Sequence, residues 1–172
     1  MKSAKRYPFL ALQQQRFTLH FSNQSSAANT PAERDFYRWA WQALKNEYRR
    51  AQISIILLDE TEARAYNRDY RGKDYATNVL SFALNEGEDL PGPHLSDGLF
   101  GDLIICPQVV LKEAAEQGKT PAQHFAHLTL HGVLHLMGYD HIEDDEAEAM
   151  ETLEIRLLNQ LAYPNPYAQD EI

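Results

Sequence analysis

The sequence predicts a single domain that contains both strands and helices. Its 172 residues are enough to enclose one hydrophobic core. Four short apolar or alternating runs have the pattern of strands, and five longer stretches carry the start and stop signals of helices. No repeat or second-domain boundary is visible. We expect the domain to span residues 17–165, between a poorly ordered leader at 1–16 and a tail at 166–172.

The four predicted strands differ in how their apolar residues are arranged. Residues 17–22 alternate apolar and polar side chains, which is typical of a half-buried strand. Residues 53–58 are β-branched and apolar, which indicates a buried strand. The other two predicted strands are residues 78–82 and 100–106, and residues 84–98 between them, rich in Gly, Pro, Asp and Glu, are expected to form a loop.

Capping signals delimit the predicted helices. Capping boxes with proline at the first helical position begin at Thr30 and at Thr120. Gly72 ends the helix that starts near Asp59, and Pro107 opens a helix of its own. The predicted helices cover approximately residues 31–49, 59–72, 107–118, 121–138 and 143–161.

Composition excludes several classes of protein. Cys106 is the only cysteine, which excludes a disulfide framework and a cysteine-based zinc site. Such cysteine usage fits a reducing compartment, so a cytoplasmic location is expected. No apolar run approaches the roughly 20 residues of a membrane span, and no membrane partner is expected.

Charge is distributed unevenly along the chain. The formal net charge is −9, which by itself argues against a nucleic-acid partner. However, residues 1–80 hold 13 Lys and Arg against 8 Asp and Glu, whereas residues 81–172 hold 3 against 17. The first half is therefore net positive by 5 and the second net negative by 14. A local basic surface that could contact RNA remains compatible with this composition.

Three histidines spaced H-x3-H-x5-H form the strongest candidate site. His131 and His135 are four residues apart, so they share one face of a helix. Gly138 can end that helix in a left-handed conformation, and His141 can then return to the same point. Three imidazole ligands with an open fourth position are typical of a catalytic zinc site, so one Zn²⁺ per chain is expected. His127 could compete as a ligand. However, three histidines along one straight helix span about 12 Å and cannot converge on one ion, so His141 is the better third ligand.

A glycine stands where a zinc protease would have its general base. Metzincin proteases have H-E-x-x-H-x-x-G-x-x-H, and Gly132 occupies the glutamate position here. Arg64, Arg68 and Arg71 are spaced to share a face of the preceding helix, and Lys73 follows. Arginine binds phosphate oxygens in a bidentate manner and stabilises developing negative charge. A metal site without the glutamate but with this basic face favours phosphodiester chemistry.

These segments together resemble the bacterial YbeY endoribonucleases, also called rRNA maturation factors. Residues 131–141 are similar to the family's histidine signature, which residues 140–146 extend. Residues 67–74 with 77–82 resemble a second block, and residues 100–106 resemble a third. The resemblance covers about residues 50–165, and the leader and first strand match less specifically.

The resemblance implies a fold, an activity and partners. The fold would be α+β, a small mixed four-stranded sheet packed by about five helices. His131, His135 and His141 would bind zinc, and Arg71 and His131 would be the catalytic residues, with Arg71 holding the scissile phosphate. The activity would be single-strand-specific endoribonuclease action in 16S rRNA maturation, especially at the 3′ end, and in ribosome quality control. The partners would be rRNA precursor, the ribosome or small-subunit proteins.

Several alternatives stay open at this stage. The chain could be a zinc hydrolase of a peptide or small amide, or a ribosome assembly factor whose zinc is structural. Asp102 matches a family position linked to ribosomal-protein contact, but a structural role in a loop–strand turn is an equal alternative. The general base is not identified, because Asp140 could serve there or simply cap the turn.

Overall fold

The computed structural model describes residues 17–84 and 98–168. These residues form a four-stranded mixed sheet and five helices in one α+β domain, which confirms the expected fold class. The strands are β1 (Phe17–Asn23), β2 (Ala51–Leu57), β3 (Val79–Ala83) and β4 (Leu99–Ile105). The helices are α2 (Glu33–Leu44), α3 (Glu60–Arg71), α4 (Pro107–Glu116), α5 (Pro121–Leu136) and α6 (Asp144–Gln160).

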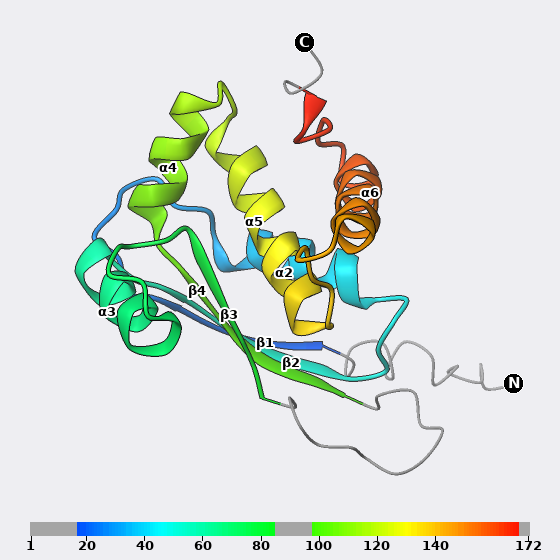
Figure 1. Ribbon diagram of the computed structural model, residues 1–172, viewed down its shortest axis with the longest axis horizontal. Helices are drawn as coiled ribbons and strands as arrows, with labels where there is room; N and C mark the ends of the chain where they lie inside the picture. The colour runs from blue at the N-terminus through cyan, green and yellow to red at the C-terminus, as the bar shows by residue number, and fades with distance from the viewer. Residues whose placement is uncertain (1–16, 85–97, 169–172) are drawn as a thin grey trace, which may run out of the picture.

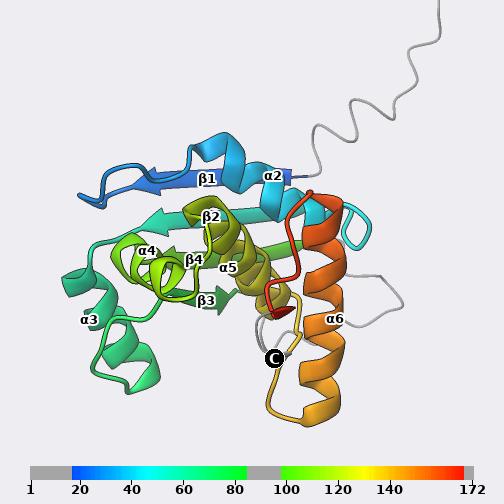
Figure 2. The same ribbon diagram turned by 90° about the horizontal axis from the view of Figure 1, so that it is seen from above.

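The sheet order is β1-β2-β4-β3. β1, β2 and β4 run parallel, and β3 pairs antiparallel with β4 at the edge. Figure 1 shows α2, α4, α5 and α6 above one face of this sheet, with α3 apart from them near the end of the sheet. Figure 2, seen from above, shows α5 lying across the sheet among the other three helices. α5 contacts β3, β4, α2, α4 and α6, so it is the central helix of the domain.

Strand alternation explains the position of the main core. Ile53, Ile55 and Leu57 of β2 are completely buried beneath the helices, and each such side chain contributes about 1.5–3 kcal/mol to stability. Ile56, between them, faces the other side and joins a smaller apolar cluster with Leu80. On that same side, the ring of Tyr70 at the end of α3 lies against Phe82.

Most predicted elements are present, with shifted ends. Thr120 is the N-cap of α5, as expected, and its capping box is complete: Gln123 N–H donates to Thr120 Oγ1 at 3.2 Å, and the Thr120 N–H donates to Gln123 Oε1 at 2.9 Å. α3 ends at Gly72, which has a φ of 69°. The expected loop at 84–98 lies almost wholly outside the described residues, as do the leader at 1–16 and residues 169–172 of the tail.

The helix predicted at 31–49 is shorter than expected. Its N-cap is Ala32 rather than Thr30, because Asp35 accepts the Ala32 N–H and Thr30 Oγ1 accepts a hydrogen bond from Asn23 instead. The helix ends at Leu44 rather than near 49, since the chain must turn before β2 begins.

One residue also lies in a different setting from the one expected. Asp102 falls in the middle of β4 and pairs with Ser54 and Phe82, so it is not in a loop–strand turn.

No helix within residues 17–84 and 98–168 is long and apolar enough to cross a membrane.

Candidate active site

α5 presents His131 and His135 on one face near its C-terminal end. The helix then closes with paired hydrogen bonds: Gly138 N–H donates to His135 O at 3.0 Å, and Tyr139 N–H donates to Leu134 O at 3.0 Å. This pairing is a Schellman motif, in which the residue after the helix takes a positive φ. Gly138 has a φ of 98°, as predicted for the residue that reverses the chain. The reversal returns His141 toward the helix.

The three predicted histidines lie together. The ring centroids are 4.5 Å apart for His131 and His135, 5.0 Å for His135 and His141, and 5.8 Å for His131 and His141. The Nε2 atoms of His131 and His135 are 2.9 Å apart. The spacing H-x3-H-x5-H therefore corresponds to one cluster in space.

The hydrogen bonds of the two α5 histidines fix which nitrogen carries the proton. His131 Nδ1 is 2.5 Å from a carboxylate oxygen of Glu154, and His135 Nδ1 is 2.9 Å from the carbonyl oxygen of Tyr139. Both partners can only accept, so each neutral ring holds its hydrogen on Nδ1. The two Nε2 atoms then face each other at 2.9 Å, a separation that suits either a metal ion bound by both lone pairs or a proton shared by the two rings. Burial, with His131 and His141 nearby, lowers the pKa of His135 and favours its neutral form.

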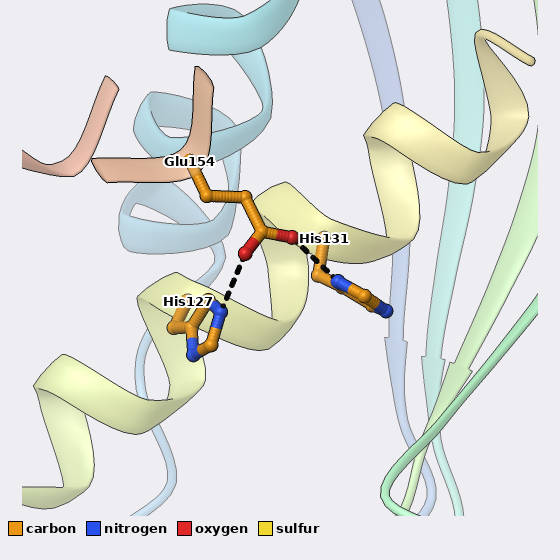
Figure 3. A group of neighbouring side chains, drawn as sticks. All are labelled: His127, His131 and Glu154. Atoms are coloured by element: carbon orange, nitrogen blue, oxygen red, sulfur yellow. Dashed lines mark hydrogen bonds and ion pairs between the residues drawn. The ribbon is translucent and has the colours of Figure 1, made fainter. Parts of the chain in front are cut away.

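Glu154 reaches this cluster from α6 and is completely buried. Figure 3 shows its carboxylate between His127 and His131, with one oxygen toward each ring. Tyr167 donates its hydroxyl to the oxygen that also contacts His127. Burial raises the pKa of Glu154, but the hydrogen bonds with His127 and His131 outweigh it and hold the pKa at about 2. Burial lowers the pKa of His127, so the carboxylate is ionised beside a neutral imidazole.

Among the residues that the structure describes, two groups of side chains come close enough to hold a metal ion. One is His127, His131 and Glu154, and the other is His135, Asp140 and His141. The two groups adjoin each other at His131 and His135, whose Nε2 atoms are 2.9 Å apart. Asp140 also accepts the backbone N–H of His141 at 2.7 Å, the turn-capping role considered from the sequence.

Arg71 lies in the same cavity as the histidines. This cavity of about 540 Å³ is lined by Arg71, Lys73 and all three predicted ligand histidines. The guanidinium group of Arg71 donates to Ser81 O at 2.7 Å and lies 5.8 Å from the centre of the Phe82 ring. These contacts hold the arginine at the end of α3 while its charge stays at the cavity wall.

The other two arginines of α3 are occupied elsewhere. Arg64 forms a two-point ion pair with Asp74, at 2.8 and 3.0 Å, and Arg68 pairs with Asp69 at 3.0 Å. Neither lines the cavity of the histidines. The predicted arginine face therefore contributes one arginine to the site, and Lys73 supplies the second cation.

Gly132 lies where α5 packs closely on β3 and β4. A Cβ atom there would come within 2.9 Å of Leu103 and 3.2 Å of Val79. Ser81 also donates its hydroxyl to the Gly132 carbonyl oxygen, at 3.1 Å, in the same crossing. A glutamate at position 132 would meet this apolar contact, so the missing protease base has a packing reason.

Glu154 and Tyr167 were not identified from the sequence. A signal for Glu154 exists, since it lies within the apolar stripe of α6, four residues after Met150 and three before Leu157. An acidic residue at such a position is buried and needs a polar partner. Tyr167 stands in the segment predicted as tail, and nothing in its sequence context indicates its contact with Glu154.

Comparisons with known proteins agree with the sequence signature. A family profile described as Endoribonuclease YbeY matches residues 20–162. A protein of Neisseria meningitidis serogroup C named Endoribonuclease YbeY is 78% identical over 171 residues, covering 99% of each chain. One of the same name from Chromobacterium violaceum is 52% identical over 172 residues, covering 100% of each. The solution structure of TM1509 from Thermotoga maritima superimposes with a TM-score of 0.55 at 25% identity, covering 84% of this chain and 92% of that one.

Proposed function

The chain belongs to the endoribonuclease YbeY family, and from that premise we propose that it is a zinc-dependent endoribonuclease acting on single-stranded RNA. His131, His135 and His141 hold one Zn²⁺, and Arg71 binds the scissile phosphate. His131 contributes to catalysis as a ligand of the zinc ion.

The observation that carries this proposal is the pair of facing imidazoles. His131 and His135 both have acceptor-only partners on Nδ1, which leaves two Nε2 lone pairs 2.9 Å apart. Two nitrogens bound to one tetrahedral zinc at about 2.0–2.1 Å are roughly 3.3 Å apart, within a few tenths of an ångström of this separation. His141 adds a third imidazole from beyond the turn. The donor set therefore fits zinc, which favours imidazole ligands in tetrahedral geometry.

The chain's own residues prepare an RNA phosphate for cleavage. Zinc, when bound, supplies a Lewis acid toward a phosphate oxygen. Arg71, held by Ser81 O and Phe82, offers its remaining guanidinium hydrogens to the negative charge that grows on the phosphate. Lys73, on the same cavity wall, can hold a neighbouring phosphate. Unpaired RNA suits such a cavity, because a single strand can bend its backbone into a recess more easily than a duplex can.

The biological setting is part of the proposal. The family relationship supports action on small-subunit rRNA precursors, including 16S rRNA 3′-end processing, and in ribosome quality control. The ribosome or its small-subunit proteins would then be partners. A single buried free cysteine, Cys106, is compatible with a cytoplasmic location.

One alternative has a specific observation in its favour. Asp140 lies close enough to His135 and His141 to complete four protein ligands, which would make the zinc structural in an assembly factor. In that case Asp140→Ala would lower the affinity for zinc. The catalytic proposal expects Asp140→Ala to keep zinc, because its contact is to the His141 backbone. Hydrolysis of a peptide or small amide is not favoured, since Gly132 is closed in by Leu103 and Val79.

The test combines metal analysis with cleavage assays on RNA and peptide. The purified protein should hold one zinc per chain and cut single-stranded RNA but not peptides. His135→Ala should lose both zinc and RNA cleavage, while His20→Ala, a histidine of β1 outside the cavity, should keep both. Undiminished cleavage in His135→Ala, or cleavage of peptides alone, would exclude the proposal.

A further inference from the structure

We propose that Glu154 is a positioning residue of the metal site, which fixes the orientation and tautomer of His131. The inference rests on the proposed function, because it assumes that His131 binds zinc through Nε2. It adds a residue of α6 to a site otherwise built by α5 and the turn after it.

The geometry assigns one carboxylate oxygen to His131. Glu154 Oε1 lies 2.5 Å from His131 Nδ1, and the carboxylate is completely buried. In this hydrogen bond His131 Nδ1–H donates to the carboxylate oxygen, which leaves the lone pair on Nε2. That lone pair is the one that faces His135. Carboxylate partners behind a ligand histidine fix the ring and raise its basicity.

The other oxygen is held in place independently. Glu154 Oε2 accepts from Tyr167 Oη and lies 3.0 Å from His127 Nε2 (Figure 3). Both oxygens therefore have partners, and the carboxylate has no free rotation toward the cavity. Tyr167 joins the chain beyond α6 to this contact, so residues near the C-terminal end support a site formed by α5.

A direct role for Glu154 as a metal ligand fits the geometry less well than a positioning role. His127, His131 and Glu154 are close enough to hold an ion, but the His131 nitrogen next to Glu154 is Nδ1, at 2.5 Å. His131 would then have to bridge two ions through both nitrogens, or abandon His135. Direct hydrogen bonds already join Glu154 to both histidines without an ion.

The test measures zinc affinity by competition with a chromophoric chelator. Glu154→Gln keeps the volume and one acceptor oxygen but removes the charge, and its zinc dissociation constant should rise about 10- to 100-fold. Excess zinc should restore RNA cleavage, because the residue acts only through His131. Tyr167→Phe should weaken zinc binding less, since it leaves the contact with His131 intact. The matched control is Glu151→Gln, an exposed residue on the same helix, which should bind zinc as the unmodified chain does.

A second measurement uses the unmodified protein, so it does not depend on whether a variant folds. Two-bond ¹H–¹⁵N spectra of the metal-free protein should show His131 protonated on Nδ1. Protonation on Nε2 alone would overturn the inference, as would unchanged zinc affinity in Glu154→Gln.

Stoichiometry separates positioning from ligation. One zinc per chain, retained in His127→Phe and lost in His135→Ala, supports the positioning role. Two zinc ions per chain, or loss of zinc in His127→Phe to the extent seen in His135→Ala, would make Glu154 a ligand and overturn it. If the unmodified protein binds no zinc, the proposed function itself fails. If the unmodified protein binds zinc and Glu154→Gln binds it with the same affinity, only this inference is rejected.

Discussion

Arg71 differs from the other two arginines of α3 in what surrounds it. Arg64 and Arg68 form ion pairs with Asp74 and Asp69, whereas Arg71 donates to a backbone carbonyl and has no ion pair with a carboxylate of residues 17–84 or 98–168. It is also the only one of the three on the wall of the histidine cavity. Sequence spacing places all three on one face, and only the folded contacts separate them.

We predict that Arg71→Ala lowers kcat for RNA cleavage by about 10²- to 10³-fold, the usual loss when one donor to transition-state charge is removed. Its zinc content should not change, because Arg71 does not contact the histidines. The matched control is Arg64→Ala, whose side chain lies outside the cavity and should alter kcat by less than about twofold. Equal losses in the two variants, measured by single-turnover cleavage, would contradict the assigned role.

The residues found from the sequence are those with a characteristic spacing. His131, His135 and His141 could be predicted because helix periodicity and Gly138 determine where they lie. Glu154 could not be assigned to His131, because their contact joins α5 and α6 and depends on how these helices pack. Spacing within one segment carries information about local geometry but not about which distant side chain completes the site.

At the scale of elements, three glycines with positive φ follow helices: Gly72 after α3, Gly118 after α4 and Gly138 after α5. Of these three, only Gly138 leads into a predicted zinc ligand. Gly138, with a φ of 98°, precedes His141, and Gly118, with a φ of 65°, follows α4. Each allows a chain reversal that a residue with a Cβ atom adopts only with strain. A Cβ atom at Gly138 would meet nothing within 4 Å, so the cost there is conformational.

We therefore predict that Gly138→Ala and Gly118→Ala each destabilise the metal-free protein by about 1–2 kcal/mol. Only Gly138→Ala should weaken zinc binding, because only its turn positions a ligand. Urea unfolding and chelator competition measure the two effects. Equal zinc affinities in the two variants would show that the turn does not position His141.

Asp59 ties three elements together at the start of α3. Its carboxylate accepts from Gln108 Nε2 at 2.5 Å, Ser25 Oγ at 2.7 Å and the Ser26 N–H at 2.9 Å. These hydrogen bonds hold the pKa of Asp59 well below its ordinary value of 3.8, and the bond from Gln108 has the largest effect. Because the folded pKa is depressed, this stabilisation is present above pH 3.8 and declines as pH falls below it.

Asp59→Asn should accordingly unfold more easily than the unmodified chain at pH 7, and the difference should shrink as pH falls below about 4. Urea unfolding at a series of pH values measures it. Glu62→Gln removes an exposed charge from the first turn of the same helix and should show a much smaller pH-dependent difference. A difference for Asp59→Asn that stays constant between pH 7 and pH 3 would mean that its ionisation is not linked to folding.

The order of the strands marks the limit of prediction for the whole molecule. Alternation and capping locate all four strands and all five helices of the described residues to within a few positions. The order β1-β2-β4-β3, with β3 antiparallel at the edge, depends on pairing between strands that are distant in the sequence, such as β2 with β4, rather than on any local pattern. The mixed sheet was predicted from the family resemblance, because the four strand-like segments alone do not indicate how the strands pair.

Uneven charge has a measurable consequence at this scale. Despite a net charge of −9, Arg71 and Lys73 meet on one cavity wall. Two phosphate contacts to single-stranded RNA give a slope of about −1.4 in a plot of log affinity against log salt concentration. Lys73→Ala should make the slope shallower by about 0.7, as measured with RNA under conditions that prevent cleavage. An unchanged slope would show that Lys73 does not contact phosphate.

The most direct test of the central claim is a zinc titration of the metal-free protein, with bound zinc and RNA cleavage measured in the same samples. Cleavage of single-stranded RNA should rise in proportion to bound zinc and level off at one ion per chain. Full cleavage before zinc is added, or no cleavage after one ion is bound, would contradict the account.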